Sequence, residues 1–182
     1  MVKGFYSDLA KAKKGEDIVR QVLQGCQDKY SITDISEIKE MWHRGDIEIH
    51  DVEENISYYL DVKDDSRIAQ TGNLLAEHRV YYVRDNKWTE GFMQRATYDY
   101  VGYLSQQDKI IYILDFKLWQ KYYLSKSEKH IHIPHGYQTT DGYLMSLDKA
   151  RKLGIVIAEI KYDTEDDITF YPIEVIKRWI FI

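Results

Sequence analysis

The chain has 182 residues, of which 44% are hydrophobic and 30% charged, the size and balance of one folded domain with a single core. Its net charge of −5 argues against a general coat for nucleic acid, which needs a strongly basic surface. No run of about 20 apolar residues occurs and the start lacks an apolar signal segment, so we expect a cytoplasmic protein. The single cysteine, Cys26, cannot form an internal disulfide, and we expect it to be a small buried side chain.

The first predicted element is a helix over residues 7–24. Ser7 or Asp8 is suited to cap its start, and Gly25 is suited to end it. Spacings of three and four residues, typical of one helix face, connect Leu9, Ala12, Glu16, Val19 and Leu23. One member of this stripe is therefore a carboxylate.

Glu16 has two interpretations. A carboxylate in an apolar stripe is costly to bury unless it is paired or bound to a metal, which makes Glu16 a candidate site residue. In the alternative, Ile18 and Val22 mark the inner face of the helix, and Glu16 lies at its edge beside Lys13. We favour the first interpretation.

Two strands that form an antiparallel hairpin come next. Over residues 45–51 and again over residues 56–63, polar and apolar side chains alternate, the pattern of half-buried strands. A polar turn joins the two segments. Asp46 lies on the polar face of the first strand, and Asp61 and Lys63 share the polar face of the second. The hairpin therefore presents acidic side chains on one face.

The remaining elements are assigned more coarsely. Strands are predicted at residues 30–38 or near 40–43, and at 73–83, 100–104 and 109–115; helices are predicted at 88–100 and 116–126. The segment between the hairpin and residue 72 is expected to be irregular or a short helix. The helix over 116–126 is expected to turn Leu118, Tyr122 and Tyr123 inward.

No repeat, low-complexity tract or linker rich in proline and glycine divides the chain. We therefore expect one domain over residues 1–182, with its core in residues 7–126 and a C-terminal extension over residues 127–182. The predicted fold class is α/β, or α+β. An N-terminal helix precedes a three-strand meander in a mixed sheet, and further helices flank the sheet.

Asp46 and the tripeptide Asp61-Val62-Lys63 carry the clearest chemical signal. Hydrolysis of a phosphodiester needs charge stabilisation at the phosphate and an activated water, and Mg²⁺ held by hard oxygen ligands supplies both. Two carboxylates beside a lysine suit this chemistry. The alternative is a solvated strand face with a cross-strand charge pair, which ordinary sheets also show.

These residues resemble the motif of the PD-(D/E)XK nuclease superfamily, which includes many restriction endonucleases and the archaeal-type Holliday-junction resolvases. In that family a helix with a glutamate precedes a meander, an aspartate opens the second strand, and a (D/E)xK tripeptide ends the third. The matching residues are Glu16, Asp46, Asp61 and Lys63. The resemblance covers roughly residues 7–120, and Gly45 stands where the family has proline.

The resemblance implies a restriction-endonuclease-like fold and a Mg²⁺-dependent deoxyribonuclease that cuts within strands, with Mn²⁺ able to substitute. The metal ligands that it implies are Glu16, Asp46, Asp61 and the backbone carbonyl of Val62. Lys63 is expected to orient or deprotonate the attacking water, and Gln70 to contact substrate or order water. Phosphate contacts are expected from Lys11, Lys13, Lys14 and Arg67.

DNA is thus the expected partner, and analogy with the family suggests a homodimer or a subunit of a larger complex. One rival hypothesis is a nuclease-fold protein that binds DNA or a protein partner without cutting. Another is a hydrolase with the same site that cuts RNA. A histidine cluster at His130, His132 and His135 is a weaker candidate for zinc, because no fourth ligand has a suitable spacing.

Overall fold

A computed structural model describes residues 3–25, 29–41, 43–125, 129–135, 137–166 and 169–177. Cys26 and the apolar end over residues 179–182 lie outside these ranges. The helices are α1 (Lys3–Gln24), the 3₁₀ helix η1 (Lys39–Met41), α2 (Ile68–Thr71), α3 (Phe92–Arg95), α4 (Phe116–Ser125) and α5 (Leu147–Lys152). The strands are β1 (Tyr30–Asp34), β2 (Ile47–Asp51), β3 (Ile56–Asp64), β4 (Asn73–Tyr82), β5 (Lys87–Glu90), β6 (Tyr100–Ser105), β7 (Ile110–Asp115), β8 (Lys129–His135), β9 (Gln138–Ser146), β10 (Val156–Glu165) and β11 (Thr169–Lys177).

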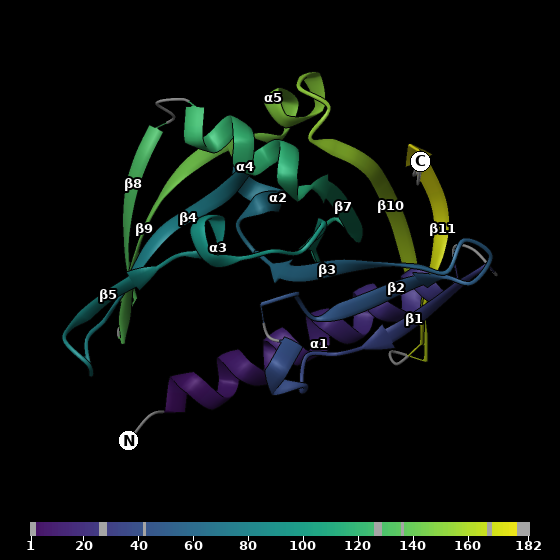
Figure 1. Cartoon of the computed structure of the whole chain (residues 1–182), viewed down its shortest axis with the longest axis horizontal. Coiled ribbons are helices and arrows are strands. Elements are labelled where there is room, and N and C mark those ends of the chain that lie inside the picture. Colours follow the sequence, from purple (N-terminus) through teal and green to yellow (C-terminus); the bar gives the residue numbers. More distant parts are fainter. Residues whose placement is uncertain are drawn as a thin grey trace.

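The described strands form two sheets (Figure 1). The larger has the order β1-β2-β3-β6-β7-β10-β11, and the smaller the order β5-β4-β9-β8. The pairing of β3 with β6 is parallel and the other pairings are antiparallel, so the larger sheet is mixed. The predicted fold class, with an N-terminal helix before a three-strand meander, is confirmed.

Two apolar cores lie on opposite faces of the larger sheet. On one face α1 packs through Ile18, Val19 and Val22 against side chains that include Leu60. On the other face α2, α4 and α5 cover the sheet (Figure 1), with Trp119 and Phe116 among the fully buried side chains. Because side chains alternate along a strand, each residue of β3 belongs to one face or the other.

Two predicted helices need correction. The segment over residues 88–100 is not one helix: it forms β5, the single turn of α3 and an extended stretch. Gly91 ends β5 where its backbone lies against β4, and a Cβ at this position would lie 2.4 Å from the Glu77 carbonyl oxygen. The helix over residues 116–126 is present as α4, but Leu118 is 37% exposed and Trp119 is the buried residue instead. Lys126 lies outside the described residues.

Residues 127–182, predicted as a C-terminal extension, contribute strands to both sheets. This part of the chain supplies β8 and β9, which build the smaller sheet with β4, and β10 and β11, which complete the larger sheet. The apolar run that begins after Gly154 becomes β10, whose Val156, Ala158 and Ile160 are buried. The first predicted strand is β1. The alternative position for that strand, near residues 40–43, begins within η1 instead. Within the described ranges no helix is long and apolar enough to cross a membrane.

Candidate active site

The β2–β3 hairpin brings Asp46 to Asp61 and Lys63. Asp46 directly precedes β2, where its N–H donates to the Leu60 carbonyl at 2.9 Å. Its side-chain Oδ2 accepts a hydrogen bond from the N–H of Val62 at 2.7 Å. Asp46 is therefore fixed to β3 through both its backbone and its side chain, beside the tripeptide that the sequence singled out.

Gly45 makes this close approach of the two strands possible. Its φ angle is +106°, and a Cβ at this position would lie 2.6 Å from the Leu60 carbonyl oxygen. Proline is locked near φ −65° and could not adopt this conformation. A glycine at this position is thus required by the backbone.

We expect Gly45→Ala to lower the free energy of unfolding by about 2 kcal/mol or more, because it adds backbone strain and a steric overlap with β3. Chemical denaturation of the two proteins measures this difference. Gly72→Ala is the matched control: Gly72 also has a positive φ, +61°, but open space surrounds its Cβ position, so only the strain applies. Equal stability of Gly45→Ala and the wild type would contradict the role given to Gly45.

Asp61 and Lys63 share the face of β3 that points away from α1. Leu60 and Val62 belong to the core under α1, whereas Tyr59, which has the same parity as Asp61, packs against the opposite core. Lys63 Nζ lies 2.6 Å from Asp61 Oδ2 and 4.9 Å from the centre of the Phe92 ring. Asp61 Oδ2 is buried and has no hydrogen-bond partner of good geometry among the described residues. The prediction that Asp61 and Lys63 share one face of their strand is confirmed.

Electrostatic forces at these side chains act in opposite directions. Burial and the nearby charge of Asp61 raise the pKa of Asp46 to about 7, while the Val62 N–H and the charge of Lys63 oppose this shift. Burial lowers the pKa of Lys63, but the charges of Asp61 and Asp46 outweigh it and raise that pKa above its usual value. Lys63 is therefore a charged donor at neutral pH, and a cation would favour ionisation of Asp46.

The raised pKa of Asp46 predicts that the metal-free protein loses stability as pH rises from about 4 to about 7. In this window the unfolded chain releases the proton that the folded chain retains, so folding becomes less favourable. We expect Asp46→Asn, which keeps an acceptor for the Val62 N–H, to raise the melting temperature in EDTA by several degrees at pH 8 and hardly at all at pH 4. A melting-temperature difference that does not depend on pH would contradict the shift.

Glu16 lies on α1, against the other face of the sheet. Its carboxylate is 3.4 Å from Lys13 Nζ, and that amine also lies 2.7 Å from Asp34 and 2.9 Å from the Ser36 hydroxyl. Burial raises the pKa of Glu16, and its charge contributes to the raised pKa of Asp46. The structure thus places Glu16 both near Asp46 and beside Lys13, and its Oε2 is buried without a hydrogen-bond partner of good geometry among the described residues. Its role at the site stays a prediction.

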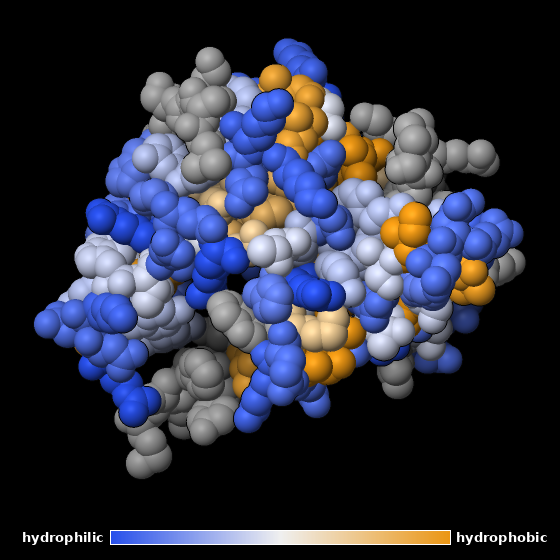
Figure 2. Space-filling view, viewed as in Figure 1, coloured by the Kyte–Doolittle hydropathy of each residue, from blue (hydrophilic) through white to orange (hydrophobic). Residues whose placement is uncertain are grey.

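A groove of about 1020 Å³ opens beside Lys63. Four residues selected from the sequence line it: Lys11, Lys14, Arg67 and Gln70. Val62 and Lys63 form part of its wall, whereas Lys13 is not among its lining residues. Figure 2 shows the surface hollowed in this region and bordered by hydrophilic side chains. The groove therefore connects the end of β3 with basic side chains from α1 and from the segment before α2.

The described residues contain no group of three or more histidine, cysteine, aspartate or glutamate side chains ready to hold a metal ion. The donors present are Asp46, Asp61, whose Oδ2 is ion-paired with Lys63, and the carbonyl of Val62, which points toward the same strand edge as the Val62 N–H. Glu16 Oε2 is a further buried carboxylate oxygen near Asp46. Mg²⁺ commonly binds through one or two carboxylates and keeps several waters. These donors fit that mode of binding and do not fit an enclosed cage.

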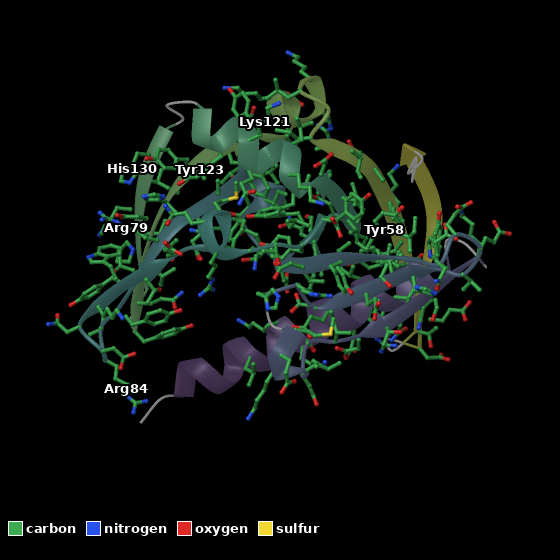
Figure 3. The ribbon with its side chains drawn as sticks, viewed as in Figure 1. Tyr58, Arg79, Arg84, Lys121, Tyr123 and His130 are labelled. Carbon is green, nitrogen blue, oxygen red and sulfur yellow. The ribbon has the colours of Figure 1, made fainter. Side chains whose placement is uncertain are left out.

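The histidines on β8 do not form a zinc site in the described part of the chain. His132 pairs with Asp141 at 2.5 Å, and Asp141 also accepts from Arg79 at 2.7 Å. Figure 3 shows Arg79 and His130 at the smaller sheet, away from the β2–β3 hairpin. The side chain of His135 lies outside the described residues.

Sequence reasoning missed three side chains at the site: Glu77 of β4, Phe92 of α3 and Tyr98. Glu77 and Phe92 line the groove with Lys63, and the charges of Asp61, Asp46 and Glu77 all act on the Tyr98 hydroxyl. These residues come from the segment between β3 and β6. No spacing in the sequence signals that this segment folds back over the hairpin.

No family model matches the chain, and no curated protein matches it. Among solved structures, it is similar to the bacterial homing endonuclease I-Ssp6803I. The two are 13% identical, the match covers 72% of this chain and 75% of that chain, and the TM-score is 0.44.

Proposed function

We propose that this protein is a Mg²⁺-dependent deoxyribonuclease of the PD-(D/E)XK type, which cuts within DNA strands. The observation that carries the proposal is the arrangement of Asp46, Asp61 and Lys63. One hairpin holds the two aspartates together, the lysine lies 2.6 Å from one of them, and a groove with basic side chains opens beside it. Two acidic side chains and a lysine, at the edge of a groove that carries further lysine and arginine side chains, suit hydrolysis of a phosphodiester.

Asp46, Asp61 and the Val62 carbonyl are the groups that would hold the cation, and Glu16, whose charge acts on Asp46, would complete the acidic cluster directly or through a water. When bound, Mg²⁺ supplies charge neutralisation at the scissile phosphate and a means to activate water. Lys63 is charged, so its role is to donate hydrogen bonds to the attacking water or to the phosphate oxygens rather than to accept a proton. The Asp61 carboxylate fixes the position of this ammonium group. Gln70, at the wall of the groove, would contact the substrate or order water.

The basic side chains of the groove would hold the DNA backbone. Lys11 and Lys14 come from α1, and Arg67 from the segment before α2, so phosphates could be contacted on two sides of Lys63. Binding of the DNA backbone depends on where the lysine and arginine side chains lie rather than on the net charge of the whole protein. A protein with a negative net charge could therefore bind DNA through a local group of basic side chains.

We expect the variant Lys11→Ala/Lys14→Ala/Arg67→Ala to bind DNA more weakly and with less dependence on salt. Removal of one lysine or arginine that neutralises a phosphate should lower the slope of log K against log salt by about 1. Fluorescence anisotropy of a labelled duplex in EDTA, at several salt concentrations, measures this slope. Lys13→Ala, next in sequence but held by Asp34, is the comparison and should leave the slope unchanged. An unchanged slope in the triple variant would show that the groove is not part of the DNA-binding surface.

Cleavage of a substrate panel tests the proposed function. The panel contains labelled linear duplex, single-stranded and four-way-junction DNA and an RNA duplex, each in Mg²⁺, Mn²⁺ or EDTA. The proposal predicts cleavage of DNA in either metal and none in EDTA. Preference for RNA would favour the rival hydrolase. Binding without cleavage in either metal would favour a nuclease-fold protein that has lost its activity.

A further inference from the structure

Side chains on one face of β3 form a row that passes through the site. Tyr59, Asp61 and Lys63 alternate with Leu60 and Val62, which belong to the core under α1. Successive members of the row lie about 7 Å apart, because a strand advances roughly 3.4 Å for each residue. The groove opens at Lys63, at one end of the row, and Tyr59 is not among its lining residues. Asp61 therefore lies between the groove and Tyr59.

Arg44 lies at the Tyr59 end of this row. Its Nη1 donates a hydrogen bond to the Tyr59 hydroxyl at 2.9 Å, and its Cζ is 5.0 Å from the centre of the Tyr59 ring. The side chain is exposed, and within the described ranges it forms no ion pair with a carboxylate, unlike four other arginines: Arg20, Arg67, Arg79 and Arg151. Asp99, beside Tyr59, is itself paired with Lys117 at 2.6 Å. The charge of Arg44 is therefore available to an anion from solvent, and the tyrosine ring orients it.

The segment that carries Arg44 also carries Asp46. Its backbone is held on two sides: the Asp46 N–H donates to β3, and the N–H and hydroxyl of Thr97 donate to the His43 carbonyl at 3.2 and 3.1 Å. The Arg44 N–H donates to the Met41 carbonyl at 2.7 Å, which closes the turn that follows η1. Short-range backbone contacts thus fix Arg44 and Asp46 relative to each other.

A second exposed arginine, Arg95, lies near the same carboxylates. It is the last residue of α3. Its charge acts on the Tyr98 hydroxyl, as do the charges of Asp61 and Asp46. Neither Arg95 nor Arg44 is among the residues that line the groove. Basic side chains therefore lie near the two aspartates outside the groove as well as within it.

We propose that Arg44 binds a phosphate of the DNA strand that is cut, on the side of the scissile phosphate away from the groove. The inference rests on the proposed function and adds the course of the strand, which runs along β3 from the groove, past Asp61, to Arg44. A DNA strand carries one phosphate for roughly each 3.4 Å of helix axis, so about 7 Å along β3 corresponds to about two nucleotides from the cut. A strand held on both sides of the cut continues past the site, as cleavage within a strand requires.

The salt dependence of DNA binding in EDTA tests the inference, measured by fluorescence anisotropy of a labelled duplex. We expect Arg44→Gln to lower the slope of log K against log salt by about 1 and to weaken binding about 3- to 5-fold. Arg44→Lys, which keeps the charge, should restore the slope. Arg84→Gln is the matched control and should change neither value: it removes an exposed arginine at the β4–β5 turn, which Figure 3 shows away from the β2–β3 hairpin.

Single-turnover cleavage in Mg²⁺ separates a role in binding from a role in the chemistry. At saturating protein, Arg44→Gln should cut within about threefold of the wild-type rate, because Arg44 holds the strand at a distance from the reacting atoms. The protein concentration that gives half of this rate should rise about 3- to 5-fold, in line with the loss of affinity.

The outcomes separate this inference from the proposed function. An unchanged slope in Arg44→Gln, beside a lower slope in the triple variant of the groove, would overturn the role of Arg44 and leave the nuclease proposal standing. Equal losses in Arg44→Gln and Arg84→Gln would indicate an effect of net charge and would also overturn it. A lower slope in Arg44→Gln, with no cleavage by the wild type in either metal, would support the phosphate contact and contradict the proposed function. Absence of DNA binding by the wild type would overturn both proposals. Circular dichroism and melting temperature in EDTA show whether each variant is folded.

Discussion

Lys63→Met is expected to lower the rate of DNA cleavage about 10³-fold while the protein stays folded. Loss of one positioned hydrogen-bond donor to the charge that develops in the transition state typically costs about 10²- to 10³-fold in rate. Methionine keeps an apolar stem to pack near Phe92 but removes the ammonium group, 2.6 Å from Asp61. Single-turnover cleavage of a labelled duplex in Mg²⁺ measures the rate, because it excludes product release.

Lys109→Met is the matched control for this change. Lys109 also forms an ion pair at 2.6 Å, with Asp163, but the pair is exposed and lies outside the lining of the groove. Its cleavage rate should equal that of the wild type. If Lys63→Met cuts as fast as Lys109→Met, Lys63 has no part in the chemistry.

Asp61→Asn is expected to have an equally large effect on cleavage and to weaken Mn²⁺ binding about 10-fold or more. Asparagine nearly matches the shape of aspartate but removes the charge that would hold the cation and that fixes Lys63. Single-turnover rates and Mn²⁺ titration of the same preparation measure both effects. Loss of cleavage with full Mn²⁺ affinity would show that Asp61 positions Lys63 without binding metal.

Asp163→Asn controls for loss of an aspartate that pairs with a lysine. It removes the partner of Lys109 at the protein surface, so neither the rate nor the metal affinity should change. Equal losses in the two variants would indicate a general effect of charge on the protein and would contradict a specific role for Asp61.

The β2–β3 hairpin was predictable because its information is local. Alternation with period two assigns each side chain to a face, and that rule correctly placed Asp61 and Lys63 opposite Leu60. The antiparallel pairing of β2 with β3 also brings Asp46 and the Asp61-Val62-Lys63 tripeptide together without a contribution from distant parts of the chain. The presence of Gly45 instead of proline has a clear physical reason in its positive φ angle.

The helix and the groove were less predictable. Stripe residues from Leu9 to Leu23 do not all face inward: Leu9 is 58% exposed, whereas Val19 and Leu23 are buried, as are Ile18 and Val22 of the alternative face. The sequence grouped three neighbouring lysines, but they point in different directions around α1, so Lys11 and Lys14 line the groove and Lys13 pairs with Asp34. Which side of the helix is buried near its start depends on the distant elements that pack against it, and these are not visible in the local sequence.

Glu77 and Tyr98 could not be found from the sequence, since their place depends on long-range packing. β4 belongs to the smaller sheet, where it pairs with β9 from the C-terminal part of the chain. The turn at Gly91 then returns α3 to the groove. The residue types of Trp88 and Thr89 favour a strand. The prediction of a helix over residues 88–100 therefore missed the strand β5 and the return of the chain to the groove at α3.

The most direct measurement of the central claim is cleavage of supercoiled plasmid by the wild-type protein, followed over time in Mg²⁺ and in EDTA, with Lys63→Met in parallel. The site predicts nicked and then linear plasmid in Mg²⁺, intact plasmid in EDTA, and intact plasmid with Lys63→Met in either condition. Intact plasmid with the folded wild type in both Mg²⁺ and Mn²⁺, or cleavage that Lys63→Met retains in full, would contradict it.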